Sequence, residues 1–245
     1  MKFALLLALV SLASARQPAF DVASLKPSPP SPGDRININL GSAQHGEVTL
    51  TNTTLSECLQ FAYGLSSEDE IAGPAWLRDR ELRVDVIAKA PPDTPRDQLL
   101  LMLQNLLTER FQMRLHREPR PLHHFELTVD KNGAKLPPAQ LSVPGAGSKL
   151  RAYGRGHLSY AHVSMQVLTL LLSRQLKEVV IDKTGLSGFY DIDLTWAPEN
   201  APETGPPLPD IYTAIREQLG LRLEASKTPI EIIVVDQALK TPIGN

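Results

Sequence analysis

The chain of 245 residues contains a single cysteine, Cys58, and no excess of charge of either sign. One cysteine excludes an internal disulfide framework, so folding depends on the hydrophobic core. The 25 Lys and Arg residues nearly balance the 27 Asp and Glu residues, which leaves a formal net charge of −2. A chain without a basic excess lacks the electrostatic footprint of a dedicated nucleic-acid-binding protein. We therefore expect no nucleic-acid partner.

Long apolar runs are also scarce, and the clearest one lies at the N-terminus. Lys2 precedes an apolar run over residues 3–12, and small residues follow at 13–15. This order is typical of a secretory signal peptide, which we predict over residues 1–15. Later apolar runs are much shorter than the roughly 20 residues of a membrane span. We expect a periplasmic or extracellular protein with no transmembrane segment after signal cleavage.

Proline and glycine indicate how the remaining chain is divided. The segment 136–148 contains Pro137, Pro138, Pro144 and two glycines, and is the best linker candidate. A second proline-rich stretch covers residues 198–209. We predict a first α+β repeat over residues 16–135, a linker over 136–148 and a second α+β repeat over 149–245.

The two sides of this linker resemble each other. Asp85 corresponds to Asp191 at an offset of 106 residues, and the other matches keep the same order. The matched segments are 46–55 with 156–165, 84–91 with 190–198, 109–115 with 217–223, and 125–130 with 231–236. Ordered matches with small changes in offset indicate a tandem duplication.

Each copy predicts the element order β-α-β-α-β-β. Thr54 and Glu57 form a capping box at the start of the first helix. Each copy is expected to close with a hairpin, 111–116 with 124–129 and 221–224 with 229–235. The fold class is therefore α+β, a tandem duplication of two small α/β sandwich domains. The predicted core pairs are Leu59 with Leu168, Leu106 with Ile215, and Leu127 with Ile233.

Six motifs together carry a family resemblance. They lie at residues 20–27, 73–77, 107–111, 116–118, 180–191 and 218–224. The chain resembles a family of uncharacterised secreted proteins of soil-associated bacteria, a domain of unknown function. Some members resemble extracellular portions joined to membrane-embedded regulatory peptidases. Each repeat is also loosely similar to the short N-terminal domain of secretins and TonB-dependent receptors, which implies protein contacts.

Several residue types carry chemistry, and each also has a structural interpretation. Asp182 and Gly185 resemble part of a phosphorylated-aspartate motif, but a turn explains these residue types better. His116 and His124 would hold a metal if they faced each other across the expected hairpin, whereas strand histidines more often face solvent. Cys58 lies beside the apolar stripe of the first helix, which favours a small hydrophobic role over catalysis.

Two further sets of residues also have both a functional and a structural interpretation. Asp191 and Asp193 share one strand face and have the residue type for acid–base catalysis, but a solvated surface is the simpler interpretation. Trp76, Tyr190 and Trp196 would form either part of the core or a binding patch, and we favour the core.

No residue is therefore assigned as catalytic, cofactor-binding or metal-ligating. We expect an exported, non-enzymatic binding or protein-interaction module of the bacterial envelope, whose partner is an envelope protein or a cell-wall component. The alternatives are a secreted hydrolase with a site between the repeats, and a ligand-sensing partner of a membrane regulatory peptidase. The sequence does not define the oligomeric state.

Overall fold

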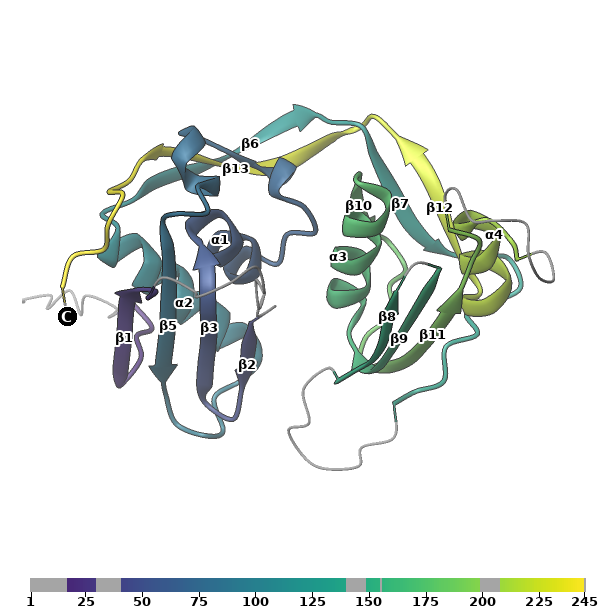
Figure 1. Cartoon of the computed structure of the whole chain (residues 1–245), viewed down its shortest axis with the longest axis horizontal. Coiled ribbons are helices and arrows are strands. Elements are labelled where there is room, and N and C mark those ends of the chain that lie inside the picture. The colour runs from purple at the N-terminus through teal and green to yellow at the C-terminus, as the bar shows by residue number, and fades with distance from the viewer. Residues whose placement is uncertain (1–16, 30–40, 140–148, 155, 199–207, 245) are drawn as a thin grey trace, which may run out of the picture.

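The computed structural model describes residues 17–29, 41–139, 149–154, 156–198 and 208–244. These residues form two lobes joined by a long two-stranded antiparallel ribbon (Figure 1). The protein is α+β, as expected, with helices packed against small sheets. The expected signal peptide, most of the expected linker and most of the stretch 198–209 lie outside the described residues.

Lobe 1 contains a four-stranded antiparallel sheet, sheet A, in the order β1-β5-β3-β2. Side chains alternate along β5: Val84, Val86 and Ala88 are buried, whereas Ile87 is exposed. One face of the sheet therefore packs on the helices. The elements are β1 (Val22–Pro27), β2 (Ser42–Gln44), β3 (Glu47–Thr54), α1 (Leu55–Tyr63), β5 (Arg83–Lys89) and α2 (Arg96–Arg110).

Lobe 2 contains a three-stranded antiparallel sheet, sheet D, in the order β11-β9-β8. This order corresponds to β5-β3-β2 in lobe 1. Among the described residues, none of the helices is long and apolar enough to cross a membrane. The elements are β8 (Lys149–Gly154), β9 (His157–Val163), α3 (Met165–Leu176), β11 (Tyr190–Thr195), α4 (Ile211–Ala214) and the π-helical turn η3 (Ile215–Leu219).

The helix termini follow local sequence signals. The predicted capping box of α1 is confirmed: the Thr54 N–H donates to the Glu57 carboxylate at 2.8 Å, and the Glu57 N–H donates to Thr54 Oγ1 at 3.1 Å. Ser164 caps α3 in the corresponding place by accepting a hydrogen bond from the Val167 N–H. Gly220 ends η3 with a φ of 64°, a left-handed conformation that glycine adopts without steric cost.

Each lobe also contains a second, three-stranded sheet. Sheet B in lobe 1 has the order β4-β13-β6, and sheet C in lobe 2 has the order β10-β7-β12. In both sheets the central strand is parallel to the first strand and antiparallel to the third. The elements are η1 (Glu68–Glu70), β4 (Ile71–Ala72), η2 (Ala75–Arg78), β6 (Arg114–Pro121), β7 (His124–Val129), β10 (Val179–Asp182), β12 (Leu221–Ser226) and β13 (Pro229–Gln237).

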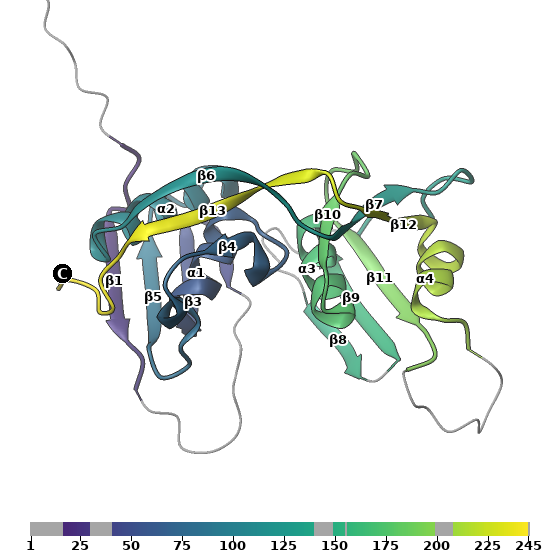
Figure 2. The same cartoon turned by 90° about the horizontal axis from the view of Figure 1, so that it is seen from above.

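The two central strands are exchanged between the halves of the chain. β6 pairs with β13 and β7 pairs with β12, so the two expected hairpins are wrong. Figure 2 shows the β6–β13 ribbon crossing lobe 1 and continuing into β7 and β12 of lobe 2. The expected boundaries at residues 135 and 149 stay a prediction about where the two repeats end and begin in the sequence.

The links between the paired strands explain this correction. Residues 122–123 connect β6 to β7, and residues 227–228 connect β12 to β13. A two-residue hairpin link needs positive φ angles, which glycine and asparagine adopt most readily. These links contain Leu122, His123, Lys227 and Thr228, and none of the four has a positive φ. The chain therefore continues in extended form and pairs with the other half.

The two hydrophobic cores reflect the exchange. The predicted core pairs are confirmed, because all six side chains are buried. Ile233, from the second half of the chain, packs in the core of lobe 1, and Leu127, from the first half, packs in the core of lobe 2. Each core therefore depends on apolar residues from both halves.

Equivalent aspartates stabilise a bulge in each lobe. Asn52 of β3 has a φ of 56°, and its N–H donates to Asp85 at 2.7 Å. His162 of β9 has a φ of 59°, and its N–H donates to Asp191 at 3.0 Å. Positive φ is strained for residues with a Cβ, and the carboxylate acceptor offsets part of this cost. The two aspartates, which the sequence comparison aligned, therefore have the same structural role.

The lobes also touch through polar side chains. Gln166 of α3 lies against Gly64 at the end of α1, where an added Cβ would come within 2.6 Å of its amide nitrogen. The Gln166 amide oxygen accepts a hydrogen bond from Arg96 of α2 at 3.3 Å. The Arg96 guanidinium in turn lies over the Phe61 ring. This contact adds a second connection between the lobes besides the ribbon.

Strand exchange predicts which engineered cysteines form a disulfide. Thr128 of β7 is paired with Arg222 of β12, so oxidation of the Thr128→Cys/Arg222→Cys variant should give an intramolecular disulfide. Mass spectrometry of the monomer measures this product. Cys58 should not interfere, because burial raises the pKa of its thiol to about 12.

The control pair is Arg117→Cys with Thr128→Cys. A tight hairpin about Leu122 and His123 would bring these two positions together, whereas the exchanged arrangement places Arg117 opposite Ile233. A disulfide in the control pair, with none in the first pair, would contradict the exchange.

The bulge in lobe 2 predicts an acid-sensitive contribution to stability. The His162 N–H, followed by the Arg151 guanidinium, holds the pKa of Asp191 below its ordinary value. A lowered pKa stabilises the folded state above the unfolded pKa of about 4, and this stabilisation is lost as pH falls through the folded value. As pH falls below about 4, the free energy of unfolding measured with urea should therefore decrease less in the Asp191→Asn variant than in the wild type.

Complete removal of the acceptor should have a larger effect. At pH 7, Asp191→Ala should lower the free energy of unfolding by about 1–3 kcal/mol, because the His162 N–H loses this acceptor. Asp193→Ala is the matched control, since Asp193 is exposed and pairs with the exposed His157. Equal losses in the two variants would show that the bulge contact has no special role.

Candidate functional site

The structure separates the two histidines considered as metal ligands. His116 lies exposed on β6 in sheet B, and its Nδ1 is 2.9 Å from an Asp236 oxygen. His124 lies buried on β7 in sheet C, so the pair does not face across a hairpin. No group of three or more His, Cys, Asp and Glu side chains suited to a metal occurs in the described part of the chain.

His124 is nevertheless unusual, because it is fully buried at the start of the exchanged strand. Its Nδ1 donates to the Leu122 carbonyl at 2.8 Å, while its Nε2 lacks a hydrogen-bond partner among the described residues. A Glu126 oxygen lies 3.7 Å from this Nε2. Glu70 of lobe 1 is also close enough to interact electrostatically with His124. Burial raises the pKa of Glu70, whose carboxylate accepts hydrogen bonds from Ser66 and Ser67.

The other reactive residue types have structural partners. Cys58 is buried in lobe 1, with its sulfur 3.2 Å from Thr53 Oγ1. Asp182 accepts hydrogen bonds from the N–H and the hydroxyl of Thr184, and Gly185 has a φ of 69°, as expected for a turn. These contacts account for the local conformation without any chemical role.

A serine, an aspartate and a histidine do meet on sheet D, but in the wrong order for a catalytic triad. Asp193 is 2.9 Å from His157 Nε2 and accepts a hydrogen bond from the Ser159 hydroxyl at 3.5 Å. In a triad the histidine lies between the serine and the carboxylate, so that it can take the hydroxyl proton. Here the carboxylate lies between the other two, so the set does not activate Ser159.

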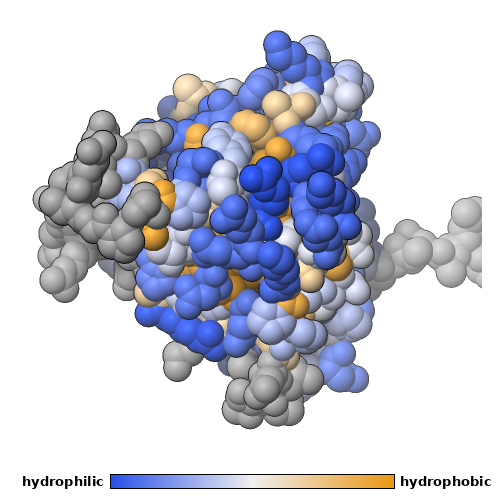
Figure 3. Space-filling view, turned by 90° about the vertical axis from the view of Figure 1, so that its right-hand side faces the viewer, coloured by the Kyte–Doolittle hydropathy of each residue, from blue (hydrophilic) through white to orange (hydrophobic). Residues whose placement is uncertain are grey.

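The aromatic residues divide between the lobes. Trp76 packs against the core of lobe 1. Trp196 is buried in the core of lobe 2, and Tyr190 packs against that same core. They do not form one patch. Figure 3 shows the end of lobe 2 near α4 and β12, where hydrophilic side chains cover most of the visible described surface.

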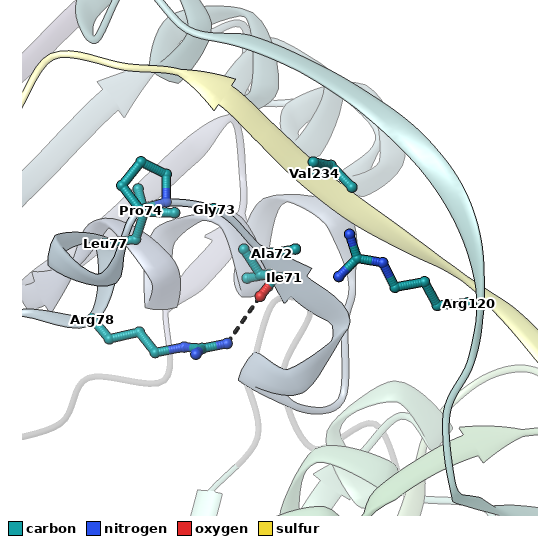
Figure 4. A pocket seen from close by; sticks show the side chains of 8 residues that line it. All are labelled: Ile71, Ala72, Gly73, Pro74, Leu77, Arg78, Arg120 and Val234. Atoms are coloured by element: carbon teal, nitrogen blue, oxygen red, sulfur yellow. Dashed lines mark hydrogen bonds between the residues drawn. The ribbon is translucent and has the colours of Figure 1, made fainter.

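A pocket of about 500 Å³ lies in lobe 1 where β4 and η2 meet the ribbon (Figure 4). Ala72 of β4 and Val234 of β13 are paired in register, so their side chains share one sheet face. Two guanidinium groups, from Arg78 and Arg120, complete the wall. The remaining lining residues are Ile71, Gly73, Pro74 and Leu77.

Arg78 is positioned by the short turn that precedes β4. Its Nη2 donates to the carbonyl oxygens of Glu68 at 2.6 Å and of Ile71 at 2.9 Å. Its Nε lies 3.4 Å from the Glu68 carboxylate. Burial raises the pKa of Glu68, and Glu57 adds to this effect, while Arg78 and Arg174 oppose it. These contacts keep the Arg78 side chain extended along the edge of β4.

Arg120 comes from the ribbon. Its Nε donates to Glu118, two residues earlier on the same face of β6, at 2.8 Å. His116, Glu118 and Arg120 follow the alternation of a strand, and His116 is opposite Val234, so Arg120 shares the face that lines the pocket. Figure 4 shows its guanidinium directed toward Ala72 and Ile71.

The arrangement is suited to binding an anion. Arginine presents a planar fork of N–H donors that matches carboxylate and phosphate oxygens. Among the described residues, the other lining side chains are apolar, and none carries a hydroxyl, thiol, imidazole or carboxylate. The lining groups that the structure describes are therefore suited to recognition.

Neither arginine is recognisable as a site residue from the sequence. Residues 73–77 appeared among the family motifs, but Arg78 and Arg120 are far apart in the chain, and Val234 joins them only through strand exchange. No spacing rule links positions that meet through an unexpected strand pairing.

Comparison with known proteins gives one family and no described activity. No curated protein and no solved structure matches the chain. The sequence model of one family matches residues 56–238, which include the pocket, both exchanged strands and the helices of both lobes. This agrees with the expected domain of unknown function. The chain therefore belongs to the family described as "Protein of unknown function (DUF3738)".

Proposed function

We propose that the protein is an exported, non-enzymatic binding module of the bacterial envelope, and that its Arg78–Arg120 pocket holds an anionic group of an envelope protein or a cell-wall component. The observation that carries this proposal is the lining of the pocket. Two guanidinium groups flank apolar walls, and no lining side chain in the described part of the chain is suited to act as nucleophile or general base. The apparent signal peptide supports export.

We further propose that the module arose by tandem duplication. The shared strand orders of sheets A and D, and of sheets B and C, support this origin. So do the equivalent bulges at Asn52 and His162. Gly46 and Gly156 add a third correspondence, since each has positive φ and each carbonyl accepts an N–H, from Ala90 just after β5 or from Trp196 just after β11.

The two halves nevertheless differ at the proposed site. In the structural alignment of sheets B and C, β13 corresponds to β7 and β6 corresponds to β12. Arg120 pairs with Ile230 of β13, and Ser226 pairs with His124 of β7, which lies 106 residues before Ile230. Ser226 therefore corresponds to Arg120, so lobe 2 lacks the guanidinium at this position. Duplication followed by divergence would leave binding in one lobe and support in the other.

The binding proposal predicts the effect of removing both arginines. Mature protein, residues 16–245, should sediment with purified cell-wall sacculi or be retained by immobilised envelope proteins. The Arg78→Ala/Arg120→Ala variant should lose about tenfold or more in affinity, since it lacks both charged recognition groups. Binding isotherms at low and high salt measure this loss, and salt should weaken the wild-type interaction.

The matched control is Arg80→Ala/Arg117→Ala, which removes the same charge outside the pocket lining. The proposal requires this control to bind almost as tightly as wild type and all variants to keep the same unfolding temperature. Equal losses in both double variants would contradict a role for the pocket. Reproducible turnover of peptide, ester, glycoside or phosphate substrates would favour the hydrolase alternative instead.

A further inference from the structure

The charge balance of the pocket restricts the anions that it can hold. Each guanidinium already faces one carboxylate: Arg78 lies beside Glu68, and Arg120 beside Glu118. These four groups alone carry a formal charge close to zero, while Arg174 and Arg80 also act on Glu68. The two glutamates lower the positive charge that faces a ligand, which penalises a phosphate dianion more than a singly charged group.

The remaining N–H donors suit a carboxylate. The polar contacts of Arg78 use its Nε and Nη2, and the hydrogen bond of Arg120 uses only its Nε. With respect to the residues that the structure describes, both terminal nitrogens of Arg120 and the Nη1 of Arg78 are thus available to a ligand. Two parallel N–H donors on one guanidinium match the two oxygens of a carboxylate.

The apolar walls restrict what lies next to that carboxylate. Ala72, Pro74 and Val234 are small or medium side chains that line the pocket. Gly73 has a φ of 153°, and a Cβ there would come within 2.8 Å of Leu77, so this wall keeps its shape only with glycine. An apolar group beside such walls buries apolar surface, whereas a charged group there would lose its hydration.

The position of Arg78 restricts how a peptide reaches the pocket. β4 is an edge strand of sheet B, and Arg78 lies along it and donates to the Ile71 carbonyl. A peptide would therefore enter with its C-terminal end rather than pair along β4, and capture of a terminal carboxylate is a recurrent way of recognising peptides. A small carboxylic acid without a peptide chain would fill less of the roughly 500 Å³ pocket than a peptide would.

We infer that the pocket binds the C-terminal carboxylate of a peptide whose last residue is apolar. This inference rests on the proposed binding function and specifies its ligand. Arg120 binds the carboxylate through its terminal nitrogens, Arg78 contributes a further donor, and Ala72, Pro74 and Val234 contact the last side chain.

Four fluorescein-labelled peptides test the inference with the mature protein, residues 16–245. They are Gly-Gly-Ala-Ala with a free carboxylate, the same peptide amidated, Gly-Gly-Ala-Asp with a free carboxylate, and amidated Gly-Gly-Ala-Glu. Fluorescence anisotropy should show the first peptide binding about tenfold or more tightly than each of the others. Inorganic phosphate should compete poorly.

Variants show where the peptide binds. Arg120→Ala should abolish the preference for the free carboxylate over the amide, whereas Arg117→Ala, on the other face of β6, should keep it. Ala72→Leu should fill the pocket and weaken binding without changing the charge. Circular dichroism and unfolding temperature check that each variant is folded, and Arg120→Lys provides a second test if Arg120→Ala is unstable.

The outcomes separate this inference from the proposed function. Equal binding of the free acid and the amide, effective competition by phosphate, or an unchanged preference in folded Arg120→Ala would overturn the inference. If envelope binding still required Arg78 and Arg120, the proposed function would stand with another ligand. If the free-acid peptide bound the pocket but no envelope fraction did, the inference would stand and the proposed envelope function would fail.

Discussion

The pairing of β6 with β13, and of β7 with β12, is the interaction on which the rest of the structure depends. Each exchanged strand is the central strand of its sheet, so neither sheet B nor sheet C is complete without the other half of the chain. The exchange also buries Ile233 in lobe 1 and Leu127 in lobe 2. Folding of the lobes is therefore coupled through both backbone hydrogen bonds and apolar burial.

The same pairing creates the candidate site. Val234 and Arg120 reach the pocket on strands of the ribbon, whereas Arg78 and Ala72 come from the segment around β4. Sheet B places these parts of the chain side by side in the order β4-β13-β6. Since the ribbon continues into lobe 2, the geometry of the pocket and the connection between the lobes share one structural element.

Local signals in the sequence predicted local structure well. The capping box at Thr54 and the apolar stripes of the helices depend on neighbours within one or two turns, and the structure agrees with them. The hairpin predictions were wrong because long-range pairing determines which strands lie side by side. Two successive strands predict a hairpin only when their link has suitable turn residues. Leu122 and His123 lack that turn chemistry. The pocket was missed for the same reason, because Arg78 and Arg120 meet only through that pairing.

Strand exchange also determines how the protein should respond to proteolysis. A cut between Ala139 and Lys149 separates the chain into two fragments, but β7 of the first fragment stays within lobe 2 and β13 of the second stays within lobe 1. The fragments are then held together by the pairs β6–β13 and β7–β12 and by both cores. Cleavage of the backbone there leaves a non-covalent heterodimer, and neither fragment can leave without opening both lobes.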